Sequence, residues 1–389
     1  MRYINRLIEK QIVEASHAFA AILLTGPRRA GKTTLLKKLF PKASYYLLED
    51  LDTIARIKAD PRSFIEEVKP PAILDEIQNI PELFNYFRTR MDEKPRRYGQ
   101  WYFTGSQDAP LMKGVSESMA GRVAVFHLLG LSSEESKKVS ILRGGLPEVL
   151  AKPKTASLWF RSYIQTYLER DVRSISAIKN LATFRRFLSL IGSRQGAVLN
   201  KTDLAAPLGI SVPALTEWIN ILEITGQIIV VPPFYENFGK RLIKSPKIYF
   251  ADSGLSCYLL GIETEDALRK SPFFGQIFEG FAASEIVKHQ ENSGKRRHIY
   301  YFRDQQGLEV DFIIPFSGNA RLLVMEAKAV RSVKPSMGIS LMKLARAIPG
   351  YKVEKYVVHL NPPKGVKKEF RTLSPGVMAI PVAEIGSLC

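Results

Sequence analysis

The sequence predicts an α/β protein, with a mainly parallel, three-layer sheet domain followed by a helical domain and a second α/β domain. Residues 20–130 alternate short apolar strands with helices, the pattern of a sheet covered on both faces. After about residue 140 the alternation gives way to amphipathic helices, and apolar strands return after residue 298. Because 389 residues are too many for one ordinary core, we expect domains over residues 1–139, 140–265 and 266–389.

The composition excludes several classes of protein. Hydrophobic residues make up 46% and charged residues 24% of the chain, as in soluble globular proteins. No apolar run reaches the roughly 20 residues of a membrane span, so we expect no membrane partner. The charged N-terminus does not resemble a signal peptide, and two cysteines cannot form a disulfide framework. These features favour a cytoplasmic protein.

Basic residues outnumber acidic ones, and the formal net charge is +18. A charge of this size predicts a polyanionic partner, with nucleic acid favoured over a membrane surface. General solubility is the alternative explanation, because charge by itself identifies no partner.

The first motif follows the apolar run Ala21–Thr25. Residues Gly26–Thr33 match G-x-x-x-x-G-K-[ST] between a strand and a helix. In such a loop, backbone N–H groups surround phosphate oxygens, the lysine reaches the β- and γ-phosphates, and the hydroxyl binds Mg²⁺. We therefore predict a site for ATP and Mg²⁺, with Lys32 catalytic and Thr33 a metal ligand. The expected nucleotide contacts are Gly26, Pro27, Arg28, Arg29, Ala30, Gly31, Lys32, Thr33 and Thr34.

The second motif is an apolar strand, residues 70–74, that ends in Asp75 and Glu76. Ligands of open α/β sheets lie at the carboxyl ends of the strands. Asp75 is therefore predicted to hold Mg²⁺, directly or through water, and Glu76 to orient and deprotonate the attacking water. A solvated surface Asp-Glu pair is the ordinary alternative, but the place of this pair after the phosphate loop favours hydrolysis.

A further strand, Gln100–Thr104, is expected to end between these two motifs. Thr104 or Ser106 is then placed to sense the γ-phosphate. A simple turn explains either residue equally well, so both assignments stay open.

The three motifs resemble those of a prokaryotic AAA+-type P-loop ATPase family, and they are Gly26–Thr33, Ile73–Gln78 and Thr104–Gln107. The resemblance covers about the first 135 residues and implies ATP hydrolysis, by a homo-oligomer if Arg122 acts on a neighbouring subunit. It also implies that Arg122 is a catalytic arginine finger that reaches the γ-phosphate of a neighbouring subunit. An ion pair of Arg122 within its own domain is the alternative. The family usually has an asparagine sensor where Thr104 or Ser106 stands here.

The middle region predicts a winged helix. We expect a helix and a tight turn at Gly209 within residues 199–211, followed by a second helix over Val212–Thr225. Two strands are expected after it, over residues 227–231 and 247–250. The basic wing between the strands is predicted to bind DNA phosphates without sequence preference, through Lys240, Arg241, Lys244 and Lys247. A winged helix that only packs on the ATPase domain is the alternative.

The last region carries carboxylates on neighbouring strands. Because residues i and i+2 share a face of a strand, Glu309 points with Asp311, and Glu326 points with Lys328. Glu279 joins them from a preceding helix. Such a group suits phosphodiester hydrolysis, since Asp311 and Glu326 would hold a second Mg²⁺ and Lys328 would position the nucleophile. All three are therefore candidate catalytic residues.

This layout, over about residues 275–360, resembles the restriction-endonuclease-like fold and the region that usually follows the ATPase in its family. Val310-Asp311 stands where that fold has a proline-aspartate pair. A salt bridge between Glu326 and Lys328 without catalysis is the alternative. Two functions follow from the whole chain. One is an ATPase that couples turnover to binding or processing nucleic acid, and the other is an ATP-dependent switch or scaffold for a protein partner with an inactive nuclease-like module.

Overall fold

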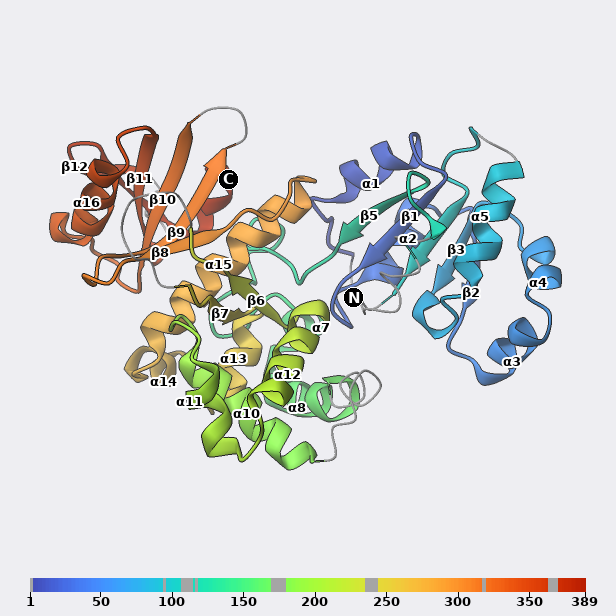
Figure 1. Ribbon diagram of the computed structural model, residues 1–389, viewed down its shortest axis with the longest axis horizontal. Helices are drawn as coiled ribbons and strands as arrows, with labels where there is room; N and C mark the ends of the chain where they lie inside the picture. The colour runs from blue at the N-terminus through green and yellow to red at the C-terminus, as the bar shows by residue number, and fades with distance from the viewer. Residues whose placement is uncertain are drawn as a thin grey trace. The chain divides into compact units, whose positions relative to one another are not determined.

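The computed structural model of the chain describes residues 3–93, 96–105, 115, 118–168, 180–234, 244–316, 320–362 and 370–389. The chain divides into two compact units (Figure 1). The first is Met1–Leu131 together with Ile224–Gly226 and Glu291–Lys295, and the second holds the remaining residues. Among the described residues, no helix is both long enough and apolar enough to cross a membrane.

A five-stranded sheet forms the centre of the first unit (Figure 1). Every neighbouring pair of its strands is parallel. The strands lie in the order β2 (Ser44–Leu47), β3 (Ala72–Asp75), β4 (Trp101–Thr104), β1 (Ala21–Thr25) and β5 (Val123–His127). Because β4 lies between β1 and β3, its carboxyl end comes between the two sequence motifs. The predicted parallel sheet is confirmed.

Helices pack on both faces of this sheet, as the side chains of β1 show. Ile22 and Leu24 join one apolar cluster with α1 (Glu9–Ser16) and α2 (Lys32–Leu39). Ala21 and Leu23 alternate with them and join a second cluster with α4 (Pro61–Glu67) and α5 (Leu83–Glu93). A further helix, α3 (Leu51–Ala59), precedes α4 and begins after an Asp50 cap. The result is the three-layer arrangement that the sequence predicts.

The second unit begins with helices around one apolar core. Around this core lie α7 (Pro147–Ala151), α8 (Ala156–Tyr163), α10 (Leu181–Arg194), α11 (Lys201–Ala205), α12 (Val212–Ile224) and α13 (Ser253–Leu259), and α14 (Glu265–Lys270) packs in a smaller cluster through Leu268. Gly209 adopts the left-handed φ of +65° in the turn before α12, as the sequence predicts. The antiparallel pair β6 (Ile228–Val231) and β7 (Lys247–Phe250) follows. The elements of a winged helix are therefore present, and the winged-helix assignment itself stays a prediction.

A six-stranded mixed sheet ends the second unit (Figure 1). Its order is β12 (Arg371–Ser374), β13 (Val377–Pro381), β11 (Lys352–His359), β10 (Arg321–Lys328), β9 (Glu309–Phe316) and β8 (Tyr300–Arg303). The helix α15 (Phe274–Asn292) precedes it, and α16 (Ile339–Ala347) packs on it through Leu341 and Leu344. A separate C-terminal α/β region is thus present, whereas its restriction-endonuclease-like assignment stays a prediction.

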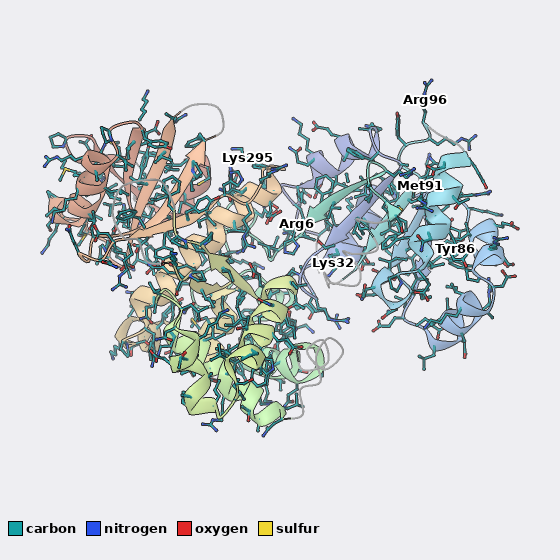
Figure 2. The ribbon with its side chains drawn as sticks, viewed as in Figure 1. Arg6, Lys32, Tyr86, Met91, Arg96 and Lys295 are labelled. Carbon is teal, nitrogen blue, oxygen red and sulfur yellow. The ribbon has the colours of Figure 1, made fainter. Side chains whose placement is uncertain are left out.

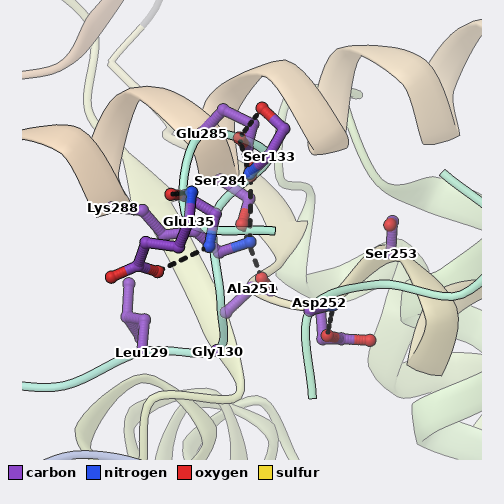
Figure 3. A network of polar contacts seen from close by, with 12 residues as sticks. Leu129, Gly130, Ser133, Glu135, Ala251, Asp252, Ser253, Ser284, Glu285 and Lys288 are labelled. Carbon is purple, nitrogen blue, oxygen red and sulfur yellow. Dashed lines mark hydrogen bonds and ion pairs between the residues drawn. The ribbon is translucent and has the colours of Figure 1, made fainter. Parts of the chain in front are cut away.

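The helical region and the C-terminal sheet are joined within the second unit. Tyr301 of β8 bonds through its backbone to Pro232 and Phe234, at the end of β6. On α15, Glu285 accepts hydrogen bonds from the backbone N–H (2.7 Å) and hydroxyl of Ser133 and from Lys288 (Figure 3). The predicted boundary between residues 265 and 266 therefore lies inside one compact unit. The division into three domains stays a prediction.

Candidate nucleotide site and carboxylate cluster

The backbone of the phosphate loop needs glycine at two positions. Gly26 has a φ of +133°, and a Cβ there would lie 2.2 Å from the carbonyl oxygen of Leu128. Gly31 has a φ of +101° and is the N-cap residue of α2. Both conformations are unfavourable for residues with a Cβ. The loop therefore approaches β5 closely and presents the N-terminus of α2, where backbone N–H groups favour an anion.

Lys32 begins α2 (Figure 2) and its side chain folds back over the loop. The residue is 6% exposed, and Nζ donates to the carbonyl oxygens of Gly26 (2.9 Å) and Pro27 (3.1 Å). These acceptors are neutral, so phosphate oxygens can replace them with stronger, charge-assisted bonds. Beside Lys32, the Ala30 side chain is buried and Thr34 is exposed.

Asp75 ends β3 and is 5% exposed. It accepts hydrogen bonds from Thr33 Oγ1, 3.0 Å from each carboxylate oxygen, from Tyr45 Oη (2.7 Å) and from the Thr104 hydroxyl. Thr104 can reach Asp75 because it ends β4, which lies beside β3 in the sheet. A carboxylate beside a threonine hydroxyl is an oxygen donor set that fits Mg²⁺.

Glu76 follows Asp75 with a φ of +60°, a left-handed conformation that is costly for a non-glycine residue. Its N–H donates to Thr104 Oγ1 (3.2 Å). Its carboxylate accepts from Gln78 Nε2 and lies 3.9 Å from Nη1 of Arg28. Another left-handed residue, Arg29, lies in the loop with a φ of +64°. The carboxylate of Glu76, the predicted general base, therefore lies beside Arg28 of the phosphate loop.

Two supporting residues were not foreseen from the sequence. Arg6 donates from Nη1 to Ala30 O (3.1 Å) and from Nη2 to Leu129 O (2.8 Å), so it braces the phosphate loop from outside (Figure 2). Tyr45 bonds to Asp75 from the neighbouring strand β2. Neither residue belongs to a motif. The contact of Tyr45 depends on the pairing of β2 with β3, which the sequence does not predict.

Arg122 and Ser106 are the two remaining candidate residues of the ATPase domain. Arg122 forms a two-bond ion pair with Asp92 of its own domain, with Nε 2.7 Å from Oδ1 and Nη2 2.9 Å from Oδ2. The hydrogen bond from Arg122 lowers the pKa of Asp92. The Arg122 side chain is 35% exposed. The structure has the pairing that the alternative interpretation describes, and the role in a neighbouring subunit stays a prediction. Ser106 lies outside the described residues.

The C-terminal candidates meet on adjacent strands. Asp311 on β9 accepts a hydrogen bond through Oδ2 from the backbone N–H of Ala327 on β10 (2.9 Å). Lys328 Nζ donates to Glu326 Oε1 (2.6 Å). The pairing of Glu326 with Lys328 is the contact that the non-catalytic alternative describes.

Lys247 lies among these carboxylates, which corrects its expected place on the DNA-binding wing. It is 1% exposed, so no phosphate backbone can reach it. Its Nζ lies 2.9 Å from Glu279 Oε1, 2.6 Å from Glu309 Oε1 and 3.5 Å from Asp311 Oδ1. Lys244 is exposed, whereas Lys240 and Arg241 lie outside the described residues. Sequence alone could not show that the first residue of β7 points inward.

Burial and charge shift the pKa values of this carboxylate cluster, which comprises Glu279, Glu309, Asp311 and Glu326. Burial, followed by the charge of Asp311, raises the pKa of both Glu279 and Glu326. Burial lowers the pKa of Lys247, but the charges of the surrounding carboxylates outweigh it and raise that pKa, so Lys247 stays charged. Within the described residues, no three or more His, Cys, Asp and Glu side chains are arranged to hold a metal ion.

Comparisons with known proteins match the chain in three segments. Residues 18–137 match an AAA domain, and the phosphate loop and parallel sheet agree with this match, so this part of the chain is a P-loop ATPase domain of the AAA type. Residues 135–266 and 274–379 match two domains of unknown function, DUF8612 and DUF4143.

Similar solved structures include the Walker-type ATPase PABY2304 of Pyrococcus abyssi, with 15% identity and a TM-score of 0.44 over 65% of this chain and 94% of that one. The RuvB Holliday junction branch migration motor of Thermotoga maritima has 16% identity and a TM-score of 0.30 over 58% and 89%.

Two mycobacterial proteins are similar over most of the chain. They are the uncharacterized proteins Rv2008c of Mycobacterium tuberculosis and Mb2031c of Mycobacterium bovis. Each is 31% identical over 350 residues, which cover 86% of this chain and 78% of the relative. The chain therefore belongs to the same family as these two mycobacterial proteins.

Proposed function

We propose that this ATPase hydrolyses the bond between the β- and γ-phosphates of ATP, in a Mg²⁺-dependent reaction at the phosphate loop. The observation that carries the proposal is the contact of Thr33 Oγ1 with both oxygens of Asp75, at 3.0 Å, beside the N-terminus of α2. Two hard oxygen donors there suit Mg²⁺, and the adjacent helix end suits phosphate.

Each side chain of the site then has one task. Lys32 exchanges its two carbonyl acceptors for β- and γ-phosphate oxygens. Thr33 and Asp75 hold Mg²⁺, which when bound neutralises charge on those phosphates. Glu76 accepts the proton of the water that attacks the γ-phosphorus, and ADP leaves. The Thr104 hydroxyl, bonded to Asp75, detects whether the γ-phosphate is present.

Glu76→Gln tests this assignment. The amide cannot take a proton, so phosphate release should fall about 100-fold or more. ATP binding should persist, because Lys32 and the loop are unchanged. Steady-state phosphate release and calorimetry with Mg-ATP measure the two effects. Glu66→Gln, an exposed change on α4, is the matched control. Unchanged turnover in Glu76→Gln would remove this residue from the reaction.

We further propose that turnover is coupled to nucleic acid. The support is the net charge of +18, which a polyanion would neutralise. Fluorescence anisotropy with labelled DNA and RNA, with ATP or ADP bound, tests it. A salt-sensitive affinity that changes with the nucleotide supports coupling, and an affinity indifferent to the nucleotide contradicts it.

A second candidate is an ATP-dependent switch or scaffold for a protein partner, with a nuclease-like module that does not cut. The burial of Lys247 within the carboxylate cluster favours the absence of cleavage. Incubation with DNA and Mg²⁺, with and without ATP, separates the possibilities. Cleavage that is lost in Asp311→Ala or Lys328→Ala would support a nuclease. An absence of cleavage under all these conditions would support the inactive module.

A further inference from the structure

The feature that carries a further inference is the ammonium group of Lys247. Its Nζ lies within 3.5 Å of carboxylate oxygens from Glu279, Glu309 and Asp311. The lysine comes from β7, whereas the acids come from α15 and β9, so the charges converge from separate elements. With three N–H donors, an ammonium can satisfy three such acceptors.

The oxygens of Asp311 face two different groups. Oδ2 accepts the backbone N–H of Ala327, and Oδ1 lies 3.5 Å from Lys247 Nζ. Asp311 therefore has one oxygen fixed by the strand and one directed at a cation. Tyr249, two residues after Lys247 on the same face of β7, donates to Glu279 Oε1. The charged end of Lys247 therefore lies between these acids.

A second and independent observation concerns Glu326. This residue is 8% exposed, and in the described part of the chain its Oε2 has no hydrogen-bond partner. Oε1 accepts from Lys328, so one oxygen of a buried carboxyl group is left over. Buried polar atoms without partners are uncommon in folded proteins. The cluster therefore has more acceptor oxygens than its lysines satisfy, which is the environment of a cation site.

We propose that Lys247 is the resident cation of the carboxylate cluster and keeps a divalent cation, such as Mg²⁺ or Mn²⁺, from binding there. The ammonium is a compact point charge and takes the position that a dication would need between Glu279 and Asp311. In agreement, the side chains of this cluster are not among any group of described residues arranged to hold a metal ion. The inference concerns the second unit and does not depend on ATP hydrolysis.

Removing the ammonium should create a metal site. Lys247→Met keeps an unbranched side chain, one heavy atom shorter, but leaves buried carboxylates without a positive charge, and oxygen ligands of this kind bind hard divalent cations. The full chain, freed of metal by a chelator and without nucleotide, is titrated with Mn²⁺, and free Mn²⁺ is followed by electron paramagnetic resonance. We expect one additional bound Mn²⁺ in Lys247→Met and a melting temperature that rises with Mn²⁺.

Three further variants assign any bound Mn²⁺ to the cluster. Lys247→Met combined with Asp311→Asn should lose the additional site, and Lys247→Arg, which keeps the charge, should not gain it. Lys244→Met, an exposed change in the same segment, should bind as the wild type does. A folded Lys247→Met protein, verified by circular dichroism, that gains no Mn²⁺ would overturn the proposal.

The wild-type protein provides a test that does not require Lys247→Met to fold. The proposal predicts equal Mn²⁺ binding by the wild type and by Asp311→Asn, because Lys247 already excludes the metal from both. A wild-type Mn²⁺ site that disappears in Asp311→Asn would overturn it. Equal binding by the two proteins supports it.

Discussion

The phosphate loop and the carboxylate cluster each bury a lysine among oxygen atoms, and the kind of oxygen differs. Lys32 donates to two backbone carbonyls, at 2.9 and 3.1 Å. Lys247 lies 2.6–3.5 Å from three carboxylates. Bonds to carbonyls are weaker than bonds between opposite charges. Lys32 can therefore leave its partners for a phosphate, whereas Lys247 is held.

The aspartates of the two regions differ in the same way. Asp75 accepts from the hydroxyls of Thr33, Tyr45 and Thr104, neutral groups that can rearrange around a cation. Asp311 instead faces an ammonium group and a backbone amide. Burial alone therefore does not distinguish a reactive site from a structural one. The charge of the neighbouring groups distinguishes them, so a lysine-to-methionine substitution should mainly affect activity in the phosphate loop and mainly affect stability in the carboxylate cluster.

Lys32→Met should have the largest effect on activity, with no measurable ATP turnover and no binding of Mg-ATP. The reason is the loss of the only ammonium that we assign to the phosphates. Its effect on the free energy of unfolding should be smaller than that of Lys247→Met, because its bonds to Gly26 and Pro27 end on neutral carbonyls rather than on carboxylates. Phosphate release, calorimetry and urea unfolding measure these three quantities. Lys38→Met, exposed on the same helix, should match the wild type, and normal turnover in Lys32→Met would contradict the assignment.

Arg122→Ala shows whether the phosphate-loop site is complete within one chain. If Arg122 acts on a neighbouring subunit, its loss should lower turnover about 1,000-fold. Asp92→Ala removes the same ion pair but keeps the arginine, so turnover should stay within about twofold of the wild type. Turnover per chain should also rise with protein concentration. Equal behaviour of the two variants would leave Arg122 with only its pairing within the domain.

Much of the nucleotide site could be predicted from the sequence, because its residues lie in short motifs. Gly26–Thr33 and Asp75-Glu76 each occupy the junction of a strand with its following turn, and the order of elements placed Thr104 between them. Arg6 could not be predicted in this way. It reaches Ala30 across 24 residues of chain, and nothing in a single basic residue indicates such a contact.

The carboxylate cluster was predicted only in part. Alternation along strands correctly paired Glu309 with Asp311 and Glu326 with Lys328. Lys247 was assigned to the wing because a basic residue among basic neighbours usually faces solvent. Its true position depends on the packing of β7 against α15 and β9, and local sequence carries no signal of that packing.

Lys247→Met should destabilise the second unit, whereas Lys32→Met should mainly abolish ATP turnover. Leaving buried carboxylates without their cation should cost about 3–5 kcal/mol in the free energy of unfolding. Urea unfolding is followed by fluorescence in a Trp101→Phe background, where Trp159 and Trp218 report on the second unit. Lys244→Met is the matched control and should change stability by less than about 0.5 kcal/mol. A cost that small for Lys247→Met would show that the ion pairs contribute little.

Glu326→Gln should have the smallest effect and a distinctive dependence on pH. Burial and the charge of Asp311 raise the pKa of Glu326 to about 8, whereas the unfolded chain releases the proton near the ordinary value. The folded state therefore holds an extra proton between about pH 5 and 8, and its stability falls as pH rises through that range. The slope contributed by Glu326 is at most about 1.4 kcal/mol per pH unit. Glutamine stays neutral and should remove this slope. The urea midpoint should therefore decline less from pH 6 to pH 8 in Glu326→Gln than in the wild type, with pH 7 measured between them.

Glu217→Gln, an exposed change on α12, is the control and should leave the slope unchanged. Identical slopes in Glu326→Gln and the wild type would mean that Glu326 titrates normally despite its burial.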